Sequence, residues 1–298
     1  MSQQLASVPY PSAPELATTE HAQRRLGPRR FNLSSLAAMM FLVVCAIYFL
    51  MPFFWLFVSA TKTGRDLVTT FGLWFGPHFN LFANLQFLFT YDHSIYVRWL
   101  LNTLIYAGIG SVVGTFVASM AGYALAKYSF AGRTFVFTIV LGSVLVPSMT
   151  LALPLFLMMS KVALTNTYWS VLLPSLVSPF GVYLSRIYAA ASVPDELLEA
   201  ARIDGVGEFR TFATIAVRLM MPALVTVLLF QFVGIWNNYF LPLIMLSNDK
   251  LFPITVGLTA YRFLAIPGAL VSTIPLLIGC VFLQRYWRNG LGTGSVKG

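Results

Sequence analysis

The stretch LLNTLIYAGIGSVVGTFVASMAGYALA, residues 100–126, contains no charged side chain. A helix needs about 20 apolar residues to cross the hydrocarbon core of a bilayer, so this stretch is long enough. In the whole chain of 298 residues, 58% are hydrophobic and only 10% are charged. A single water-soluble core cannot hide that proportion of apolar side chains. The composition therefore predicts an all-α protein embedded in a membrane.

Five other windows are also long and apolar enough to span a bilayer. The six predicted transmembrane helices are about 34–59, 100–126, 134–159, 168–190, 220–246 and 263–284. The first is too long for the apolar core of a signal peptide, so we expect it to remain as an anchor.

These windows divide the chain into four regions. Residues 1–30 are polar, rich in Pro, Ser and Ala, and unable to bury a core, so they are expected to be a disordered tail. Residues 31–99 hold the first span and an aromatic outer loop, residues 100–285 hold the other five spans, and residues 286–298 form a C-terminal tail. A polar loop, residues 191–220, lies between spans four and five.

Basic residues predict the orientation, because they are retained on the cytoplasmic side of a membrane. With the N-terminus inside, thirteen of the 19 Lys and Arg residues lie in cytoplasmic segments. These are Arg24, Arg25, Arg29, Arg30, Lys127, Arg133, Arg186, Arg202, Arg210, Arg218, Arg285, Arg288 and Lys297. The outer segments hold Lys62, Arg65, Arg98, Lys161, Lys250 and Arg262. The split predicts a multi-pass protein with both termini in the cytoplasm.

Several function classes find little support in the sequence. The net charge of +9 is spread over short segments between apolar runs, which argues against nucleic-acid binding. Cys45 and Cys280 both lie in apolar runs and are interpreted as small core residues. His78, His93 and Asp92 share the first outer loop and are metal-ligand candidates, although unpatterned loop histidines are usually surface residues.

The spans themselves also limit the mechanism. No charged residue lies near the middle of any window, which argues against an ion-coupled carrier. Small residues at Gly110, Gly114, Ala118 and Gly122 form one stripe, along which another helix can approach closely. The stripe allows either a contact that slides during gating or static helix packing. The many prolines in the later spans can kink their helices, which suits either a transport pathway or a static bundle.

The loop 191–220 carries five of the ten acidic residues and is predicted to be a helical hairpin. Pro194 suits a first helical turn, and Asp195 and Glu196 complement the positive end of the helix dipole. Gly205 can adopt the left-handed conformation that ends the helix. A second helix is expected from about Glu208 to Arg218. From the residues alone, the first helix either docks in a groove of a partner or lies on the membrane surface.

The spacing within this loop resembles a known motif. Glu199-Ala200-Ala201, three residues, Gly205, nine residues and Ile215 are similar to the cytoplasmic loop of permeases in binding-protein-dependent ATP-binding-cassette importers. The resemblance to the sugar-uptake branch, and within it to the smaller permease of maltose-type heterodimers, extends over nearly the whole chain. It includes the blocks Leu172–Val182, Trp236–Tyr239 and Gln284–Trp287 with the ending Gly294–Gly298.

The resemblance implies a permease subunit of the bacterial inner membrane that imports a carbohydrate, such as a di- or oligosaccharide. It implies a second permease, two ATP-binding subunits that use ATP and Mg²⁺, and an extracytoplasmic solute-binding protein. The chain itself is expected to bind no cofactor or metal and to have no catalytic residues. In this family the loop helix couples to the ATPase, a role that falls here on Glu199, Ala200, Ala201, Arg202, Asp204 and Gly205.

The sequence departs from the family after the motif, where a Leu-Pro pair is usual and Val217-Arg218 stands instead. Proline would break the helix, whereas arginine does not. We therefore predict a helix that runs through Arg218 into span five and bends, if anywhere, near Pro222.

Energy is expected from another subunit, because the chain contains no G-x-x-x-x-G-K-[ST] phosphate loop. Nor does it contain an H-E-x-x-H or G-x-S-x-G motif that would support a membrane enzyme.

Sugar recognition combines aromatic faces with amide and hydroxyl groups. The candidate pathway residues on span five are Gln231, Trp236, Asn237, Asn238 and Tyr239, which can equally serve in helix packing. A polyol or glycerol phosphate is the alternative substrate. The aromatic outer loop suits a partner or the membrane interface.

Overall fold

The computed structural model describes the backbone of residues 33–292 and the side chains of residues 35–282. The predicted N-terminal tail and the final residues 293–298 lie outside the described residues. Of the described residues, those from Met51 onward form one compact unit, and the first part of α1, up to Leu50, belongs to a second unit.

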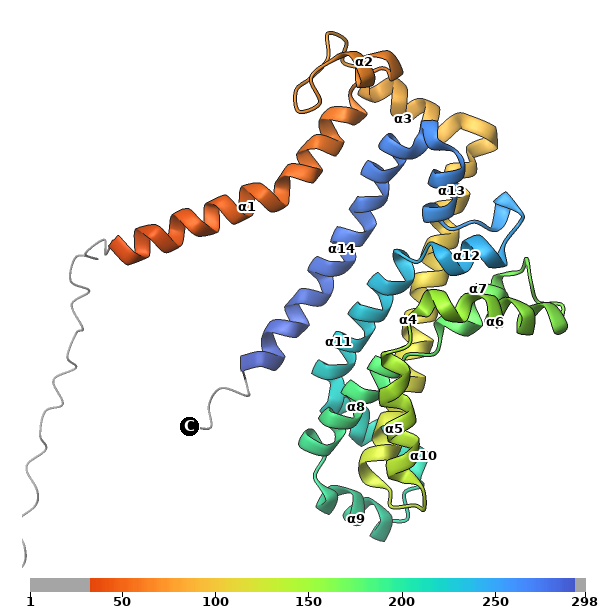
Figure 1. The fold of residues 1–298 in the computed structure, drawn as a ribbon. Coiled ribbons are helices and arrows are strands. Elements are labelled where there is room, and N and C mark those ends of the chain that lie inside the picture. Colours follow the sequence, from red (N-terminus) through yellow and green to blue (C-terminus); the bar gives the residue numbers. More distant parts are fainter. Residues whose placement is uncertain (1–32, 293–298) are drawn as a thin grey trace, which may run out of the picture. The chain divides into compact units, whose positions relative to one another are not determined.

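The described residues form a helical protein (Figure 1). The α-helices are α1 Leu33–Ala60, α2 Gly64–Thr69, α3 Leu81–Thr90, α4 Ile95–Lys127, α5 Arg133–Val144, α6 Ser148–Lys161, α7 Tyr168–Ser175, α8 Pro179–Ser192, α9 Asp195–Ile203, α10 Glu208–Thr211, α11 Val217–Trp236, α12 Phe240–Met245, α13 Ile254–Ala260 and α14 Ala265–Gly292. Short 3₁₀ turns are η1 Tyr91–Ser94, η3 Asp249–Leu251 and η4 Arg262–Leu264, and η2 Phe212–Ala216 is π-helical.

By length and composition, five helical segments among the described residues can each cross a bilayer. They are Ser35–Ala60, Leu81–Lys127, Tyr168–Ser192, Glu208–Trp236 and Arg262–Phe282. The pair α5 and α6 supplies a sixth if the two count together, although they are bent by 108°. These findings confirm the predicted all-α membrane fold with up to six spans.

The third predicted window, 134–159, is wrong as a single straight helix. It breaks after α5, and α6 begins only after Pro147, whose backbone is extended at ψ 127°. Proline lacks the amide that would continue the helix, and it disfavours the helical conformation in the preceding Val146. The third window is therefore two helices that meet at a sharp bend, which makes it a broken span or a re-entrant loop.

The fifth predicted window, 220–246, is displaced toward the C-terminus. The observed segment begins at Glu208 and ends at Trp236, before the separate short helix α12. Gly207 precedes it in an extended conformation, and Asn237 leaves the helical geometry at its end. The second part of the loop 191–220 is therefore continuous with the membrane helix. The helix passes through Arg218 without a break, which confirms that prediction.

Helix α4 is the centre of the compact unit and packs against both α8 and α11 (Figure 1). The stripe of small residues makes these contacts possible. A methyl group added at Gly110 would lie 2.8 Å from Ile235 of α11, and one at Gly122 would lie 2.5 Å from Ser185 of α8. At Gly122 the added atom would also lie 2.7 Å from the backbone nitrogen of Arg186, which cannot move aside as a flexible side chain can, so a larger residue does not fit there. The predicted close helix approach is confirmed.

Polar bonds hold the predicted outer end of α4 to the segment between α12 and α14. The Asn102 amide donates to the carbonyls of Lys250 and Phe252, both at 3.0 Å. The indole of Trp99 donates to the Asp249 carbonyl at 2.8 Å, and Trp99 is fully buried. These bonds fix the helices around the cavity described below.

Candidate functional site

Helix α9 forms the first part of the predicted coupling loop and has a defined end. Gly205 adopts the left-handed conformation at φ 74°. Its amide donates to the Arg202 carbonyl at 3.0 Å, and the Val206 amide donates to the Ala201 carbonyl at 2.9 Å. This pair of bonds is a Schellman motif, which satisfies the last carbonyls of a helix. The prediction of a helix closed by Gly205 is confirmed.

The inner face of α9 packs against the chain's own helices. Leu198 is only 4% exposed and joins a buried cluster whose other members are Tyr123, Ala189, Val193, Phe212, Ala216, Met220 and Leu224. Ala201, which was predicted to couple to a partner, is buried on the same side and 5% exposed. The cluster draws residues from α4, α8, η2 and α11, so the position of α9 depends directly on the transmembrane helices.

Two polar contacts anchor the loop to the end of α4. Lys127 donates to Asp195 Oδ1 at 2.8 Å, and the Lys127 side chain is almost fully covered. Since its long aliphatic stem lies against apolar surface, the charged end reaches the first turn of α9. Negative charge is favourable there because it meets the positive end of the helix dipole.

The second contact closes the hairpin. Arg202 Nε donates to Glu208 Oε1 at 2.8 Å, and the hydroxyl of Tyr128 donates to Glu208 Oε2 at 2.5 Å. Burial and the hydrogen bond to Glu208 hold the pKa of Tyr128 above its usual range. The Glu208 carboxylate likewise raises the pKa of Arg202. The three side chains join α9, α10 and the residue that follows α4.

The outer face of α9 is uncovered in this chain. Ile203 is 86% exposed and Leu197 is 43% exposed. Glu199 and Ala200 are exposed as well. Of the other predicted coupling residues, Arg202, Asp204 and Gly205 lie on the exposed C-terminal end of the helix. Ile203 and Leu197 are therefore exposed apolar side chains on this face of α9. The motif did not single out Ile203, but its apolar side chain between two charged residues was the available signal.

The predicted pathway residues separate into two groups. Gln231 lies between helices: its amide donates to the Ser175 carbonyl at 3.0 Å, and Thr115 Oγ1 donates to its Oε1 at 3.5 Å. This is the packing role that the sequence also allowed. The backbone carbonyl of Asn238 accepts a hydrogen bond from Thr255 Oγ1 at 2.8 Å.

The other group lines a cavity of about 390 Å³. Trp236 and Asn237 come from the end of α11, Tyr239 directly precedes α12, and the remaining lining comes from α13 and α14. Those residues are Ile254, Thr255, Leu258, Thr259, Ala265, Ala269 and Ser272. An indole, a phenol, an amide and three hydroxyl groups thus surround one space, which suits a ligand with apolar faces and a polar rim. The hydroxyl residues were not predicted from the sequence. Thr255 and Thr259 are four apart and so share a helix face.

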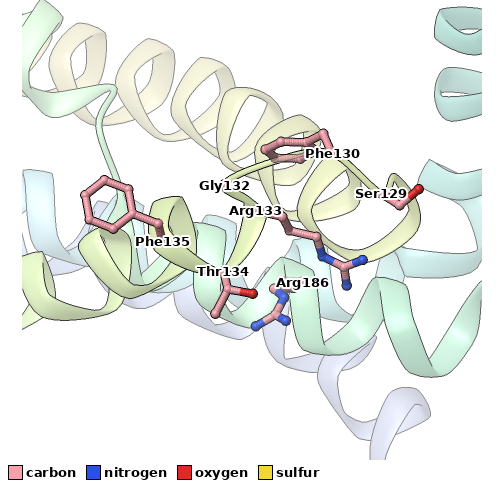
Figure 2. A pocket seen from close by; sticks show the side chains of 7 residues that line it. All are labelled: Ser129, Phe130, Gly132, Arg133, Thr134, Phe135 and Arg186. Atoms are coloured by element: carbon pink, nitrogen blue, oxygen red, sulfur yellow. The ribbon is translucent and has the colours of Figure 1, made fainter.

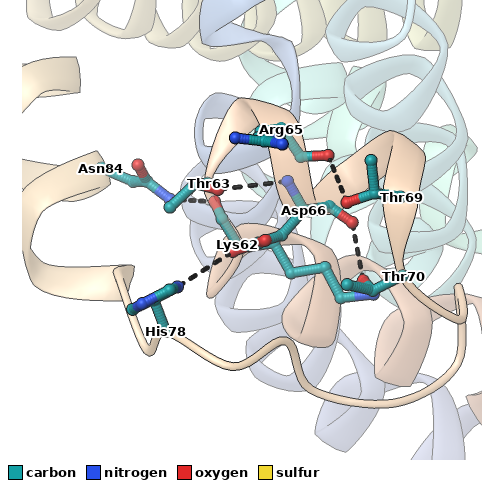
Figure 3. Close-up of polar contacts among 8 residues, drawn as sticks. All are labelled: Lys62, Thr63, Arg65, Asp66, Thr69, Thr70, His78 and Asn84. Carbon is teal, nitrogen blue, oxygen red and sulfur yellow. Dashed lines mark hydrogen bonds and ion pairs between the residues drawn. The ribbon is translucent and has the colours of Figure 1, made fainter.

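The segment between α1 and α4 is an ordered cap rather than a plain loop (Figure 3). Asn84 donates to the carbonyls of Ala60 and Lys62 at 2.8 and 2.9 Å, and the buried Lys62 ammonium donates to the Phe71 carbonyl at 2.7 Å. Asp66 faces His78 at 3.8 Å. The aromatic residues of this cap are largely exposed, namely Phe71, Trp74, Phe75, Phe79, Phe82, Phe87 and Phe89.

Comparisons with known proteins match this architecture. Residues 110–288 match the family of binding-protein-dependent transport system inner membrane components. The chain is 34% identical to the arabinooligosaccharides transport system permease protein AraQ of Bacillus subtilis, over 90% of this chain and 98% of AraQ. It is 30% identical to the lactose transport system permease protein LacG of Rhizobium radiobacter, over 86% of this chain and 94% of LacG.

The fold also matches a solved structure. One chain of a bacterial ABC transporter involved in the import of the acidic polysaccharide alginate superposes with a TM-score of 0.72. The match covers 87% of this chain and 98% of that chain, at 21% sequence identity. The two proteins therefore share a fold.

Proposed function

This chain belongs to the family of binding-protein-dependent transport system inner membrane components, and we propose that it is the permease subunit of an ATP-driven importer for a di- or oligosaccharide. The observation that carries the proposal is the likeness over most of the chain to the arabinooligosaccharide and lactose permeases, at 34% and 30% identity. The exposed outer face of α9 supports the coupling part of the proposal.

ATP hydrolysis is assigned to a separate subunit. The sequence has no phosphate-binding loop of the ATPase type. In our proposal, α9 docks on an ATP-binding subunit through Ile203, Ala200 and Glu199. The inner face of α9 is fixed to the transmembrane helices through Leu198. A movement of the docked subunit is then passed to α4, α8 and α11, because the buried cluster joins all of them to α9.

The cavity at the end of α11 is the proposed place where this subunit meets the sugar. The ring of Tyr239 can stack on an apolar face of a pyranose or furanose. Trp236 is 3% exposed and packs in a hydrophobic cluster, so it supports this wall from behind. The hydroxyl groups of Thr255, Thr259 and Ser272 already donate to backbone carbonyls, so their oxygens, with that of the Asn237 amide, can accept hydrogen bonds from the sugar hydroxyl groups. Its volume of about 390 Å³ lies within the usual range for small-ligand pockets.

The remaining partners follow from the family. We propose a second permease subunit that completes the pathway, two ATP-binding subunits and an extracytoplasmic binding protein that delivers the sugar. The orientation with both termini in the cytoplasm rests on the distribution of Lys and Arg residues. It places the cap of residues 61–94 on the outer side, where its exposed aromatic residues face the binding protein or the membrane interface.

Purification through an affinity tag on this chain tests the proposal. We expect an ATP-binding subunit and a second permease to co-purify. In proteoliposomes with the binding protein, arabino-oligosaccharide, lactose or maltodextrin should stimulate ATP hydrolysis. Stimulation by a polyol or glycerol phosphate alone would contradict the carbohydrate assignment. A chain that purifies alone and transports solute by itself would contradict the subunit assignment.

A further inference from the structure

A second cavity, of about 530 Å³, lies at the predicted cytoplasmic boundary of the membrane and is separate from the coupling loop (Figure 2). It is lined by Ser129, Phe130, Gly132, Arg133, Thr134, Phe135 and Arg186. The lining comes from the α4–α5 connection, the start of α5 and the middle of α8. None of these residues belongs to the predicted transport pathway or to the coupling motif.

The two arginines are held in place by backbone carbonyls at the end of α4. Arg133 donates to the carbonyls of Tyr128 and Ala126 at 3.3 and 3.4 Å. Arg186 donates through Nε to the Leu125 carbonyl at 3.4 Å. The last carbonyls of a helix lack partners within the helix, so they are natural acceptors for a guanidinium. Both side chains are thereby fixed and half-buried rather than free to extend into water.

Arg186 is also stacked on an aromatic ring. Its guanidinium carbon lies 3.6 Å from the centre of the Phe137 ring, and Phe137 stacks in turn on Tyr183. A guanidinium that packs by its flat face keeps its edge free to donate hydrogen bonds. Each guanidinium has five N–H groups, of which the carbonyls take only one or two.

The positive charge of this cavity has no anionic partner among the described side chains. The salt bridges in this part of the chain are Lys127 with Asp195 and Arg202 with Glu208. The carboxylates of Asp195 and Glu208 are therefore each engaged by another cation. The two half-buried arginines therefore present positive charge that is not paired with a carboxylate among the described side chains.

We propose that this cavity binds a phosphate group, carried by an anionic phospholipid headgroup of the inner leaflet or free in the cytoplasm. Arg133 and Arg186 share the phosphate oxygens, since a guanidinium fork matches a phosphate in a bidentate fashion. The hydroxyl groups of Ser129 and Thr134 are additional donors beside them. Phe130 and Phe135 at the rim are 47% and 70% exposed, as suits residues at the headgroup level of a membrane.

Native mass spectrometry of the complete transporter from nanodiscs tests the proposal. The discs contain phosphatidylcholine alone or with phosphatidylglycerol. In a parallel arm, inorganic phosphate is added to the complex in a neutral detergent, and its thermal shift is measured. We expect one of the two phosphate sources to bind in an arginine-dependent manner, and the arm that responds identifies the source.

The double variant Arg133→Gln, Arg186→Gln should lower that binding by at least about fivefold, the factor expected for one basic residue at a membrane surface. The double variant Arg133→Lys, Arg186→Lys keeps both charges and should retain most of the binding, which separates lost charge from disturbed packing. Arg210→Gln is the matched control, because Arg210 is an exposed cation on the same predicted side but outside the cavity. Equal losses in Arg210→Gln and the glutamine double variant would overturn the proposal, as would unchanged binding in the latter.

Discussion

Truncation of a side chain on the exposed face of α9 should weaken partner binding, whereas truncation on the buried face should destabilise the chain. Ile203 is 86% exposed, so Ile203→Ala removes no contact that stabilises this chain by itself. If the side chain is buried against the ATP-binding subunit, the truncation costs about 2 kcal/mol, at about 0.8 kcal/mol for each lost carbon group. Affinity for that subunit should then fall roughly thirtyfold, since each 1.4 kcal/mol is a factor of ten.

Leu198→Ala should act within the chain instead. Leu198 is 4% exposed and sits in the cluster that joins α9 to α4 and α11. Truncation of a buried leucine leaves a cavity and typically costs about 2–5 kcal/mol of stability. We therefore expect a lower unfolding temperature for this variant, with a loss of coupling that follows from a loosened α9.

The assay compares both variants in the purified complex by two measurements, the ATP-binding subunit retained after washing and thermal unfolding followed by fluorescence. Val68→Ala is the control for Ile203→Ala, because Val68 is 84% exposed but lies on the opposite predicted side. Full retention and normal uptake in Ile203→Ala would refute docking through this face. A large fall in its unfolding temperature would show that Ile203 supports the chain's own fold.

Two further outcomes are expected from the packing and the orientation. Gly114→Ala should destabilise the chain by about 1–3 kcal/mol in thermal unfolding, because the methyl group would overlap the side-chain amide of Gln231 in α11. Gly108→Ala should have little effect, because nothing lies within 4 Å of the added atom. Single cysteines in place of His78 or Lys250 should react with a membrane-impermeant reagent in intact cells, and a cysteine in place of Arg202 should not. The reverse labelling pattern would show that the chain has the opposite orientation.

Helix positions could be predicted from the sequence where apolar length alone decides them. The first span and the long helix around residues 100–126 follow from uninterrupted apolar runs. The sharp bend before α6 could not be predicted, because one proline either kinks a helix or ends it, and packing decides between these outcomes. The end of the fifth span was missed since Asn237 and Asn238 are compatible with a helix.

The coupling loop shows how far local signals reach. Pro194, the acidic first turn and Gly205 predict α9 and its end correctly, because capping is determined by neighbouring residues. Which side of α9 faces inward depends on helices distant in sequence. The motif places Ala201 among the coupling residues, whereas its side chain packs inside this chain. A bulky substitution of Ala201 would therefore disturb this fold as well as any partner contact.

Uptake of a labelled oligosaccharide by proteoliposomes of the complete transporter tests the central claim most directly. We expect uptake to require the binding protein and ATP on the side of the ATP-binding subunit, and to stop when that subunit is removed. Uptake without ATP, driven by a proton or sodium gradient across the same membrane, would contradict it.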